Sequence, residues 1–497
     1  MSYLDNLKAA TDFKLTENGA IAHSSTGSDL YDLFAFGGAY RNRTVEDCLT
    51  LFAKAFNENP TYAMKCLFYL RDVRGGQGER RFFREVVKYL AIHETEAMRR
   101  NLQYIPEFGR WDDLYVFIDT PLMMDAFALI KEQLALDVQC KTPSLLAKWL
   151  KSENTSSDES KMLGNLTRMY LKMSHKQYRK TLSILRERIN VLERLMSAGR
   201  WDEIEFDKIP SKAGLVYKNA FARRDVIKAK YEAFAKDTST KVNAATLYPY
   251  EVVRKALNNF AYNGRWLSTD TDRAMINKYW DNLADYFNGA TLNALAVVDT
   301  SGSMNSSYNS PNIKPIDVAI SLGLYCAQKA QGPFHNHYIS FASRPQMIDT
   351  TAPDFCQAVY NIYKTNLIDN TNLEAAFGLL LNTAITHHTP QNELPESLII
   401  ISDMEIDEAR YGWGRALETP EATMETIKRS WAAAGYKCPK LVYWNVNARN
   451  NTILDKSANV SYVSGCSPVI FEQIMKGKTG YDLMMDKLND ERYSCIK

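Results

Sequence analysis

The spacing of apolar residues changes near residue 290, and this change limits the chain to a helical part followed by an α/β part. Over residues 44–290 apolar side chains recur every three or four positions, as in amphipathic helices, and strand signals are nearly absent. Beyond that point short apolar runs such as LNALAVVD and ESLIIISD alternate with helical segments. This alternation indicates a mainly parallel sheet covered on both faces. The sequence therefore predicts an all-helical, HEAT-like ring or solenoid of stacked helix pairs, followed by an α/β domain.

The length of 497 residues is too great for one ordinary core, so we expect several domains. We predict an N-terminal segment over residues 1–43 that packs on the ring, a helical-repeat domain over 44–288 and an α/β domain over 289–497. The sequence has no apolar stretch of membrane-spanning length and no secretory signal, and its eight cysteines are scattered. We therefore expect reduced thiols, a cytoplasmic location and no membrane partner.

Basic side chains are concentrated in the helical part. The net charge is +6 over residues 1–290 and −4 over residues 291–497, and the segment 141–235 alone carries +9. Such a concentration favours phosphate-rich partners. A solvated helical surface would explain it equally well.

Oxygen-bearing side chains gather where the predicted strands of the α/β part end. Asp299, Ser301 and Ser303 lie on one loop after a strand, Thr371 stands just before a helix, and Asp403 ends the most hydrophobic strand. Two carboxylates and three hydroxyls suit Mg²⁺, or Mn²⁺, and not zinc. The alternative is that the two aspartates merely cap helices at strand ends.

The motifs of phosphate-transferring enzymes are incomplete in this sequence. A phosphoaspartyl nucleophile needs a second aspartate two positions on, and position 301 is Ser. The segment KGKTG at 476–480 lacks the earlier glycine of a P-loop, because position 472 is Glu. We find no nucleophile–base pair either, so we expect no catalytic residues and no enzymatic activity.

The tripeptide Gly-Arg-Trp occurs three times, in segments 107–114, 197–204 and 262–269. The first two follow helical segments, so Gly109 and Gly199 fit the ends of helices. The spacing is irregular, and we interpret these segments as structural corners between helices instead of ligand sites.

Many basic residues of the helical part are candidates for contacts with RNA phosphates. Tyr178, Tyr217 and Phe221 lie among them, as aromatic residues often do in proteins that bind single strands. The same aromatics also fit the core faces of helices. The predicted RNA-binding residues are Arg74, Arg80, Arg81, Arg84, Lys148, Arg179, Lys180, Arg186, Arg188, Lys212, Lys218, Arg223 and Arg224.

The motif D-T-S-G-S at 299–303, followed by Thr371 and Asp403, resembles the metal-ion-dependent adhesion site (MIDAS) of von Willebrand factor A (vWA) domains. The resemblance implies a Rossmann-like domain that binds Mg²⁺ through these residues. It also implies that the metal engages an acidic residue of a protein partner and does not catalyse a reaction.

Segments of the helical part, among them LFYLRDVRGGQGERRFFREVVKYL and YIPEFGRWDDL, resemble a family of helical-plus-A-domain proteins distantly related to the Ro/TROVE proteins. In the Ro ribonucleoproteins a ring of helical repeats is closed by an A domain. Single-stranded RNA ends bind in the hole, and small structured RNA binds outside. The resemblance implies a non-enzymatic, Ro-like RNA-binding protein here. The alternative is a protein-interaction scaffold whose metal site captures an acidic residue, and the oligomeric state is left open.

Overall fold

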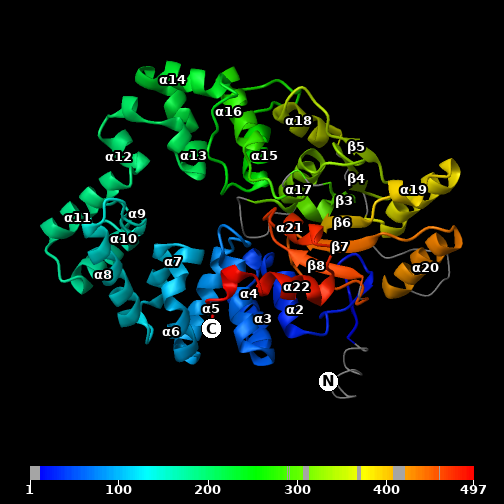
Figure 1. Cartoon of the computed structure of the whole chain (residues 1–497), viewed down its shortest axis with the longest axis horizontal. Coiled ribbons are helices and arrows are strands. Elements are labelled where there is room, and N and C mark those ends of the chain that lie inside the picture. Colours follow the sequence, from blue (N-terminus) through cyan, green and yellow to red (C-terminus); the bar gives the residue numbers. More distant parts are fainter. Residues whose placement is uncertain are drawn as a thin grey trace.

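The computed structural model is a ring of helices with an α/β unit on one side (Figure 1). The chain runs once around the ring, and its C-terminal part returns beside the N-terminal helices (Figure 1). The structure describes residues 12–287, 289, 291–305, 313–365, 371–406, 420–457 and 459–497. The predicted N-terminal segment lies partly outside these residues, and the three predicted domain ranges stay predictions.

The ring is built from helices joined by short loops and 3-10 turns, and a small antiparallel hairpin precedes them. The hairpin strands are β1 (Lys14–Leu15) and β2 (Ile21–Ala22). The helices are α2 (Asp29–Gly37), α3 (Val45–Glu58), α4 (Pro60–Arg71), α5 (Arg80–His93), α6 (Thr95–Asn101), α7 (Ile105–Phe108), α8 (Met123–Gln139), α9 (Leu146–Trp149), α10 (Asp158–Tyr170), α11 (His175–Arg188), α12 (Leu192–Ser197), α13 (Ser211–Arg223), α14 (Asp225–Lys236), α15 (Pro249–Leu257) and α16 (Asp270–Asp281). A 3-10 helix, η3 (Trp111–Phe117), follows α7.

Local sequence signals set the ends of these helices. The Thr44 hydroxyl accepts a hydrogen bond from the Asp47 backbone N–H, and the Asp47 carboxylate accepts one from the Thr44 N–H, which forms a capping box before α3. Asn59 then ends α3 and caps α4, whose first residue is Pro60. These signals are local, so the sequence alone reveals them.

The α/β part is a mixed sheet of six strands in the order β5-β4-β3-β6-β7-β8. Every neighbouring pair is parallel except β4 and β5. The strands are β3 (Ala294–Asp299), β4 (His337–Phe341), β5 (Met347–Asp349), β6 (Ser397–Ser402), β7 (Lys440–Asn445) and β8 (Val460–Ser464). The accompanying helices are α17 (Pro315–Lys329), α18 (Phe355–Thr365), α19 (Leu373–His387), α20 (Pro420–Ala433), α21 (Ile470–Met475) and α22 (Gly480–Leu488). The predicted fold class, a helical part followed by an α/β part, is confirmed.

Strand β3 lies where the strand order changes direction. The chain leaves β3 toward β4 on one side and later returns to β6 on the other side. Val298 is opposite Ile401 in the parallel β3–β6 pair. Asp299 and Asp403 therefore come at the same edge of the sheet, at the carboxyl ends of its two central strands.

The ring is closed on both sides of the α/β unit. Helix α2 packs against β8, where the Tyr462 N–H donates to the Tyr31 hydroxyl at 2.8 Å. Helix α15 packs against α17 and α18. The two ends of the helical path also meet directly, because the Tyr248 hydroxyl donates to the Gln77 carbonyl oxygen at 2.9 Å.

Within the described ranges, no helix combines the length and the apolar character needed to cross a membrane. All eight cysteines lie in the described part of the chain, and their thiols are free. Burial raises the pKa of the Cys48 thiol to about 11 and that of Cys326 to about 12. These two thiols are therefore protonated and unreactive near neutral pH.

Candidate functional site

A large basic cavity lies inside the helical ring, with a volume of about 1350 Å³. Its wall comes from the α4–α5 connection, the turn after α7, helices α9, α11, α12 and α13, and the segment that leads into α15. Nine arginines and two lysines line it, against three glutamates. The ring thus brings cations from distant parts of the sequence to the wall of one cavity.

Six of these eleven cations are held by groups of the protein itself. Arg81 donates to the Arg43 carbonyl oxygen at 2.6 Å, and Arg186 donates to the carbonyl oxygens of Ala147 and Leu150 at 2.8 Å each. The other four form ion pairs: Arg41 with Glu79 (3.2 Å), Arg71 with Asp113 (2.7 Å), Arg194 with Glu187 (2.9 Å) and Lys212 with Glu251 (2.6 Å).

The other five cations of the cavity, Arg74, Arg80, Arg110, Lys148 and Arg179, have no carboxylate partner among the described residues. Arg74 donates to the Glu107 carbonyl oxygen at 2.9 Å, and Arg179 makes a long contact of 3.4 Å within its own helix. A cluster of positive charges without counter-charges is unfavourable unless an anion joins it. We call these five residues the cavity cations.

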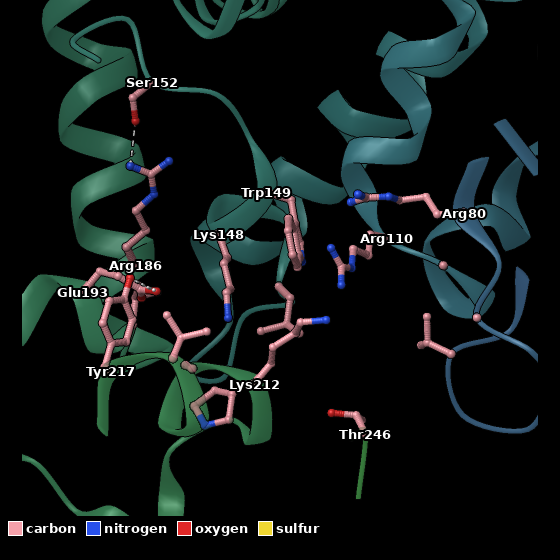
Figure 2. Close-up of a pocket in the computed structure, with 18 of the residues that line it drawn as sticks. Arg80, Arg110, Lys148, Trp149, Ser152, Arg186, Glu193, Lys212, Tyr217 and Thr246 are labelled. Atoms are coloured by element: carbon pink, nitrogen blue, oxygen red, sulfur yellow. Dashed lines mark hydrogen bonds between the residues drawn. The ribbon is translucent and has the colours of Figure 1, made fainter. Parts of the chain in front are cut away.

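Arg110, Trp149 and Arg80 converge on one part of the cavity wall (Figure 2). The Arg110 guanidinium carbon lies 4.5 Å from the centre of the Trp149 ring. Burial lowers the pKa of Arg110, and the positive charges of Arg71 and Arg80 lower it further. The carboxylates of Asp112 and Asp113 act in the opposite direction, but the pKa of Arg110 stays below its ordinary value.

The cavity gathers seven of the thirteen predicted RNA-binding residues on one surface. They are Arg74, Arg80, Arg81, Lys148, Arg179, Arg186 and Lys212. Arg81 and Arg186 donate hydrogen bonds to backbone carbonyl oxygens there, so they stabilise the cavity wall and also give it positive charge. Their contact with RNA stays a prediction.

The structure corrects the predicted set at Lys218 and Arg84. Lys218 is buried and forms an ion pair with the equally buried Asp272 of α16. Arg84 binds Asp113 at 2.6 Å and Asp112 at 3.1 Å and does not line the cavity. Each side chain forms ion pairs with carboxylates of a different helix or turn and so stabilises the packing of these elements. We therefore remove both residues from the RNA-binding candidates.

Four more predicted residues, Lys180, Arg188, Arg223 and Arg224, are exposed and lie outside the cavity lining. Arg188 donates to the Val138 carbonyl oxygen at 2.9 Å. The Arg224 guanidinium lies over the Trp201 ring at 4.9 Å. Their role in RNA binding stays a prediction for the outer surface of the ring.

Sequence reasoning missed Arg110 and Trp149. Of the aromatics it did select, Phe221 and Tyr178 are buried, and only Tyr178 and the half-buried Tyr217 line the cavity. Arg110 belongs to the first Gly-Arg-Trp segment, which does form a turn between α7 and η3. The signal that could have revealed it was an arginine beside an expected turn in a basic region, which is weak without the fold.

Four of the five predicted metal-binding residues, Asp299, Ser301, Ser303 and Asp403, lie at the edge of the sheet where β3 and β6 end, and Thr371 precedes α19. Asp299, Ser301, Thr371 and Asp403 are all buried, with at most 6% of their surface exposed. The Ser301 N–H donates to Asp299 Oδ1 at 2.9 Å, and Ser402 Oγ donates to Asp299 Oδ2 at 2.5 Å. The edge thus carries two buried carboxylates on neighbouring strands.

The chemistry of these residues fits a divalent cation. Ser301 Oγ and Ser303 Oγ are 3.0 Å apart, close to the separation of two adjacent ligands around an octahedral Mg²⁺ with bonds of about 2.1 Å. Burial and the nearby charge of Asp299 raise the pKa of Asp403 above its ordinary value, and a cation between the two carboxylates would offset both effects. The described residues contain no group of three or more His, Cys, Asp or Glu side chains suited to a metal. A metal here would therefore depend on hydroxyl oxygens.

The guanidinium of Arg449 contacts this edge of the sheet. Arg449 Nη2 binds Asp403 Oδ2 at 2.8 Å, and Arg449 Nη1 binds Glu17 Oε2 at 2.6 Å. Glu17 lies in the turn of the β1–β2 hairpin, and its N–H donates to Glu405 Oε2 at 2.7 Å. Asn18 of the same turn donates to the Glu405 carbonyl oxygen at 2.6 Å. The N-terminal hairpin is thus held against the same edge of the sheet.

Two family models match this chain, each over a different part of the sequence. The model of a family described as "Domain of unknown function (DUF2828)" matches residues 16–123 and 133–290. A second, "Domain of unknown function (DUF7788)", matches residues 293–493. An uncharacterised protein, L728 of Acanthamoeba polyphaga mimivirus, is 29% identical over 512 residues, covering 94% of this chain and 85% of that protein.

A solved structure, the RO (RSR) protein of Deinococcus radiodurans, matches with a TM-score of 0.35 and 12% identity. The match covers 92% of this chain and 100% of that one. A TM-score and an identity this low do not establish a shared fold or a shared function.

Proposed function

We propose that this chain, which belongs to the family described as a domain of unknown function (DUF2828), binds single-stranded RNA in the basic cavity of its helical ring. The observation that carries the proposal is the set of five cavity cations, which line one cavity and have no carboxylate partners in the described part of the chain. RNA phosphates would supply the missing negative charge.

The form of the cavity favours a polymer over a small anion. Its volume of about 1350 Å³ is larger than a small anion needs. The five cavity cations come from four separate segments: the α4–α5 connection with the start of α5, the α7–η3 turn, α9 and α11. Spaced cations of this kind suit successive phosphates of an extended strand.

The aromatic residues of the wall favour an unpaired strand. Trp149, Tyr217 and Tyr248 line the cavity beside the cations and are half-buried, whereas Tyr178 and Tyr250 line it but are buried. Unpaired bases can stack on exposed aromatic or guanidinium planes, whereas the bases of a duplex are already stacked inside it. The resemblance of the sequence to the Ro/TROVE proteins favours RNA over DNA, and the proposal includes no catalytic step.

In the α/β unit we propose a Mg²⁺ site as a second, separate function. Asp299, Ser301, Ser303 and Asp403 would hold the ion, with Thr371 as a further oxygen donor. The bound ion would supply a Lewis-acidic position for a carboxylate of a protein partner. The buried carboxylate pair is the observation that favours this scaffold function.

Fluorescence anisotropy with a labelled single-stranded oligoribonucleotide of about 12 nucleotides tests RNA binding. We expect saturable binding to this strand, weaker binding to the corresponding blunt duplex, and weaker binding to single-stranded DNA of the same sequence. Absence of binding at low salt, or a preference for the duplex, would overturn the proposal. The metal site is tested separately by calorimetric titration with Mg²⁺, with Asp299→Ala as the variant that should lose the signal.

A further inference from the structure

Arg80, Arg110 and Trp149 reach the same part of the cavity from three separate segments. Arg80 is the first residue of α5, Arg110 lies in the turn between α7 and η3, and Trp149 is the last residue of α9. In Figure 2 the Arg80 side chain extends toward Arg110, and Arg110 lies beside the Trp149 ring. The fold therefore builds a local site that no single stretch of sequence contains.

Trp149 holds the Arg110 guanidinium in place without using its hydrogen-bond donors. The guanidinium carbon lies over the indole at 4.5 Å, a cation–π contact. A guanidinium carries its N–H groups in its own plane, so a contact made through its face leaves the donors available to a ligand. No hydrogen bond from this guanidinium to another described residue accompanies the contact.

Arg80 and Arg110 repel each other in this arrangement. Arg80 is exposed to the cavity, and its charge lowers the pKa of Arg110. Neither guanidinium is paired with a carboxylate in the described part of the chain. The nearby carboxylates of Asp113 and Asp112 are instead bonded to Arg71 and Arg84. An anion that bridges the two guanidinium groups would turn this repulsion into attraction.

We propose that Arg80 and Arg110 together hold one backbone phosphate of the single strand, and that Trp149 fixes the plane of Arg110 for this contact. This inference rests on the proposed RNA-binding function and names the subsite within it. Lys148, whose ammonium lies 5.7 Å from the Trp149 ring centre, supplies a further positive charge beside the site. The ligand class is the phosphodiester of an unpaired strand, held by the planar donors of two arginines.

The experiment separates the geometry of the site from its charge. Arg110→Lys keeps the positive charge but removes the planar donors, and Trp149→Leu keeps apolar volume but removes the ring. We expect each to weaken binding of the labelled strand roughly 10-fold, and Arg110→Ala roughly 30-fold. Lys228→Ala is the matched control and should bind like the wild type, because Lys228 is an exposed cation of α14 that lies outside both the cavity lining and the predicted RNA-binding set.

Two further measurements keep the inference testable. Thermal unfolding of each variant shows whether the variant is folded. Intrinsic fluorescence reports on Trp149, because RNA bound beside Arg110 should change the emission of this tryptophan. The change should be reduced in Trp149→Leu. Strands with and without a terminal phosphate should bind alike, whereas binding that needs the terminal phosphate would overturn the assignment to a backbone phosphate.

The outcomes distinguish the subsite from the function on which it rests. If the wild type does not bind the strand, the proposed RNA-binding function fails. If the wild type binds and folded Arg110→Lys and Trp149→Leu both bind equally well, the subsite is wrong while RNA binding stands.

Discussion

Raising the salt concentration should weaken RNA binding along a line whose slope follows from the charges in the cavity. Each protein cation that neutralises a phosphate of a single strand contributes about −0.7 to the slope of log K against log salt. Arg80 and Arg110 share one phosphate in the proposed subsite, so the five cavity cations neutralise about four phosphates and give a slope of about −2.8. Between about 50 and 200 mM salt this corresponds to a loss of affinity of roughly 50-fold.

Anisotropy titrations of the labelled strand over a salt series measure this slope directly. Arg179→Ala removes a cavity cation outside the two-arginine subsite and should make the slope shallower by about 0.7. Arg84→Ala is the informative contrast, because Arg84 is bonded to Asp112 and Asp113 and does not line the cavity. It should lower thermal stability and leave the slope unchanged.

Two results would refute this reasoning. A slope near zero would mean that phosphates do not replace counterions at the cavity. An equal slope for Arg179→Ala and the wild type would mean that the strand binds elsewhere on the molecule, for which the exposed cations of the outer surface would be the next candidates.

Three other predictions concern the metal edge and the core. Arg449→Ala should raise the affinity for Mg²⁺ roughly 10-fold in calorimetric titration, because the Arg449 guanidinium binds Asp403 Oδ2 and competes with the metal for this oxygen. An unchanged affinity would contradict this competition. Lys218→Ala should lower the free energy of unfolding by about 3–5 kcal/mol in denaturant titration, because it leaves Asp272 buried and unpaired, while RNA affinity stays the same. Burial raises the pKa of Asp32 to about 6. Its folded-state pKa is thus above its unfolded value, and the cost to stability grows as pH rises from about 4 to 6 and is full above that range. Asp32→Asn should then add up to about 3 kcal/mol of stability at pH 8 and little at pH 4, as melting temperatures at both pH values will show.

Two features could be predicted from the sequence: the order of the helical and α/β parts, and the position of Asp299 and Asp403 at one edge of the sheet. The sequence signals for the first are local, and the second follows from the topology of a parallel sheet. Thr44, Asn59 and Pro60 mark helix ends through neighbours in the sequence. Asp299 and Asp403 follow apolar strands, and parallel neighbouring strands bring their carboxyl ends together. Neither prediction required knowledge of contacts between remote side chains.

The roles of individual cations could not be predicted in this way. Lys218 and Asp272 are 54 residues apart, and nothing in the helical periodicity distinguishes Lys218 from an exposed lysine. Arg186 of α11 donates hydrogen bonds to three acceptors, in Ala147, Leu150 and Ser152, which lie in α9 and the segment after it. A basic residue on an amphipathic helix becomes structural or remains available according to what the tertiary fold places opposite it.

The Gly-Arg-Trp segments show why a repeated motif did not reveal the cavity site. At 109–111 the arginine lies over Trp149 from another helix and faces the cavity, whereas Arg200 of the second copy binds the carboxylate of Glu203 three residues away on the surface. In the third copy Trp266 lies beside Arg273, a residue from the following helix. The tripeptide accounts for the turn in each case, but the partner of its arginine is set by the surrounding fold. If the phosphate subsite exists, it should therefore respond to substitution of Arg110 and not of Arg200, although the local sequence of the two arginines is the same. Equal losses of affinity for Arg110→Ala and Arg200→Ala would show that the motif, and not the cavity, carries the binding.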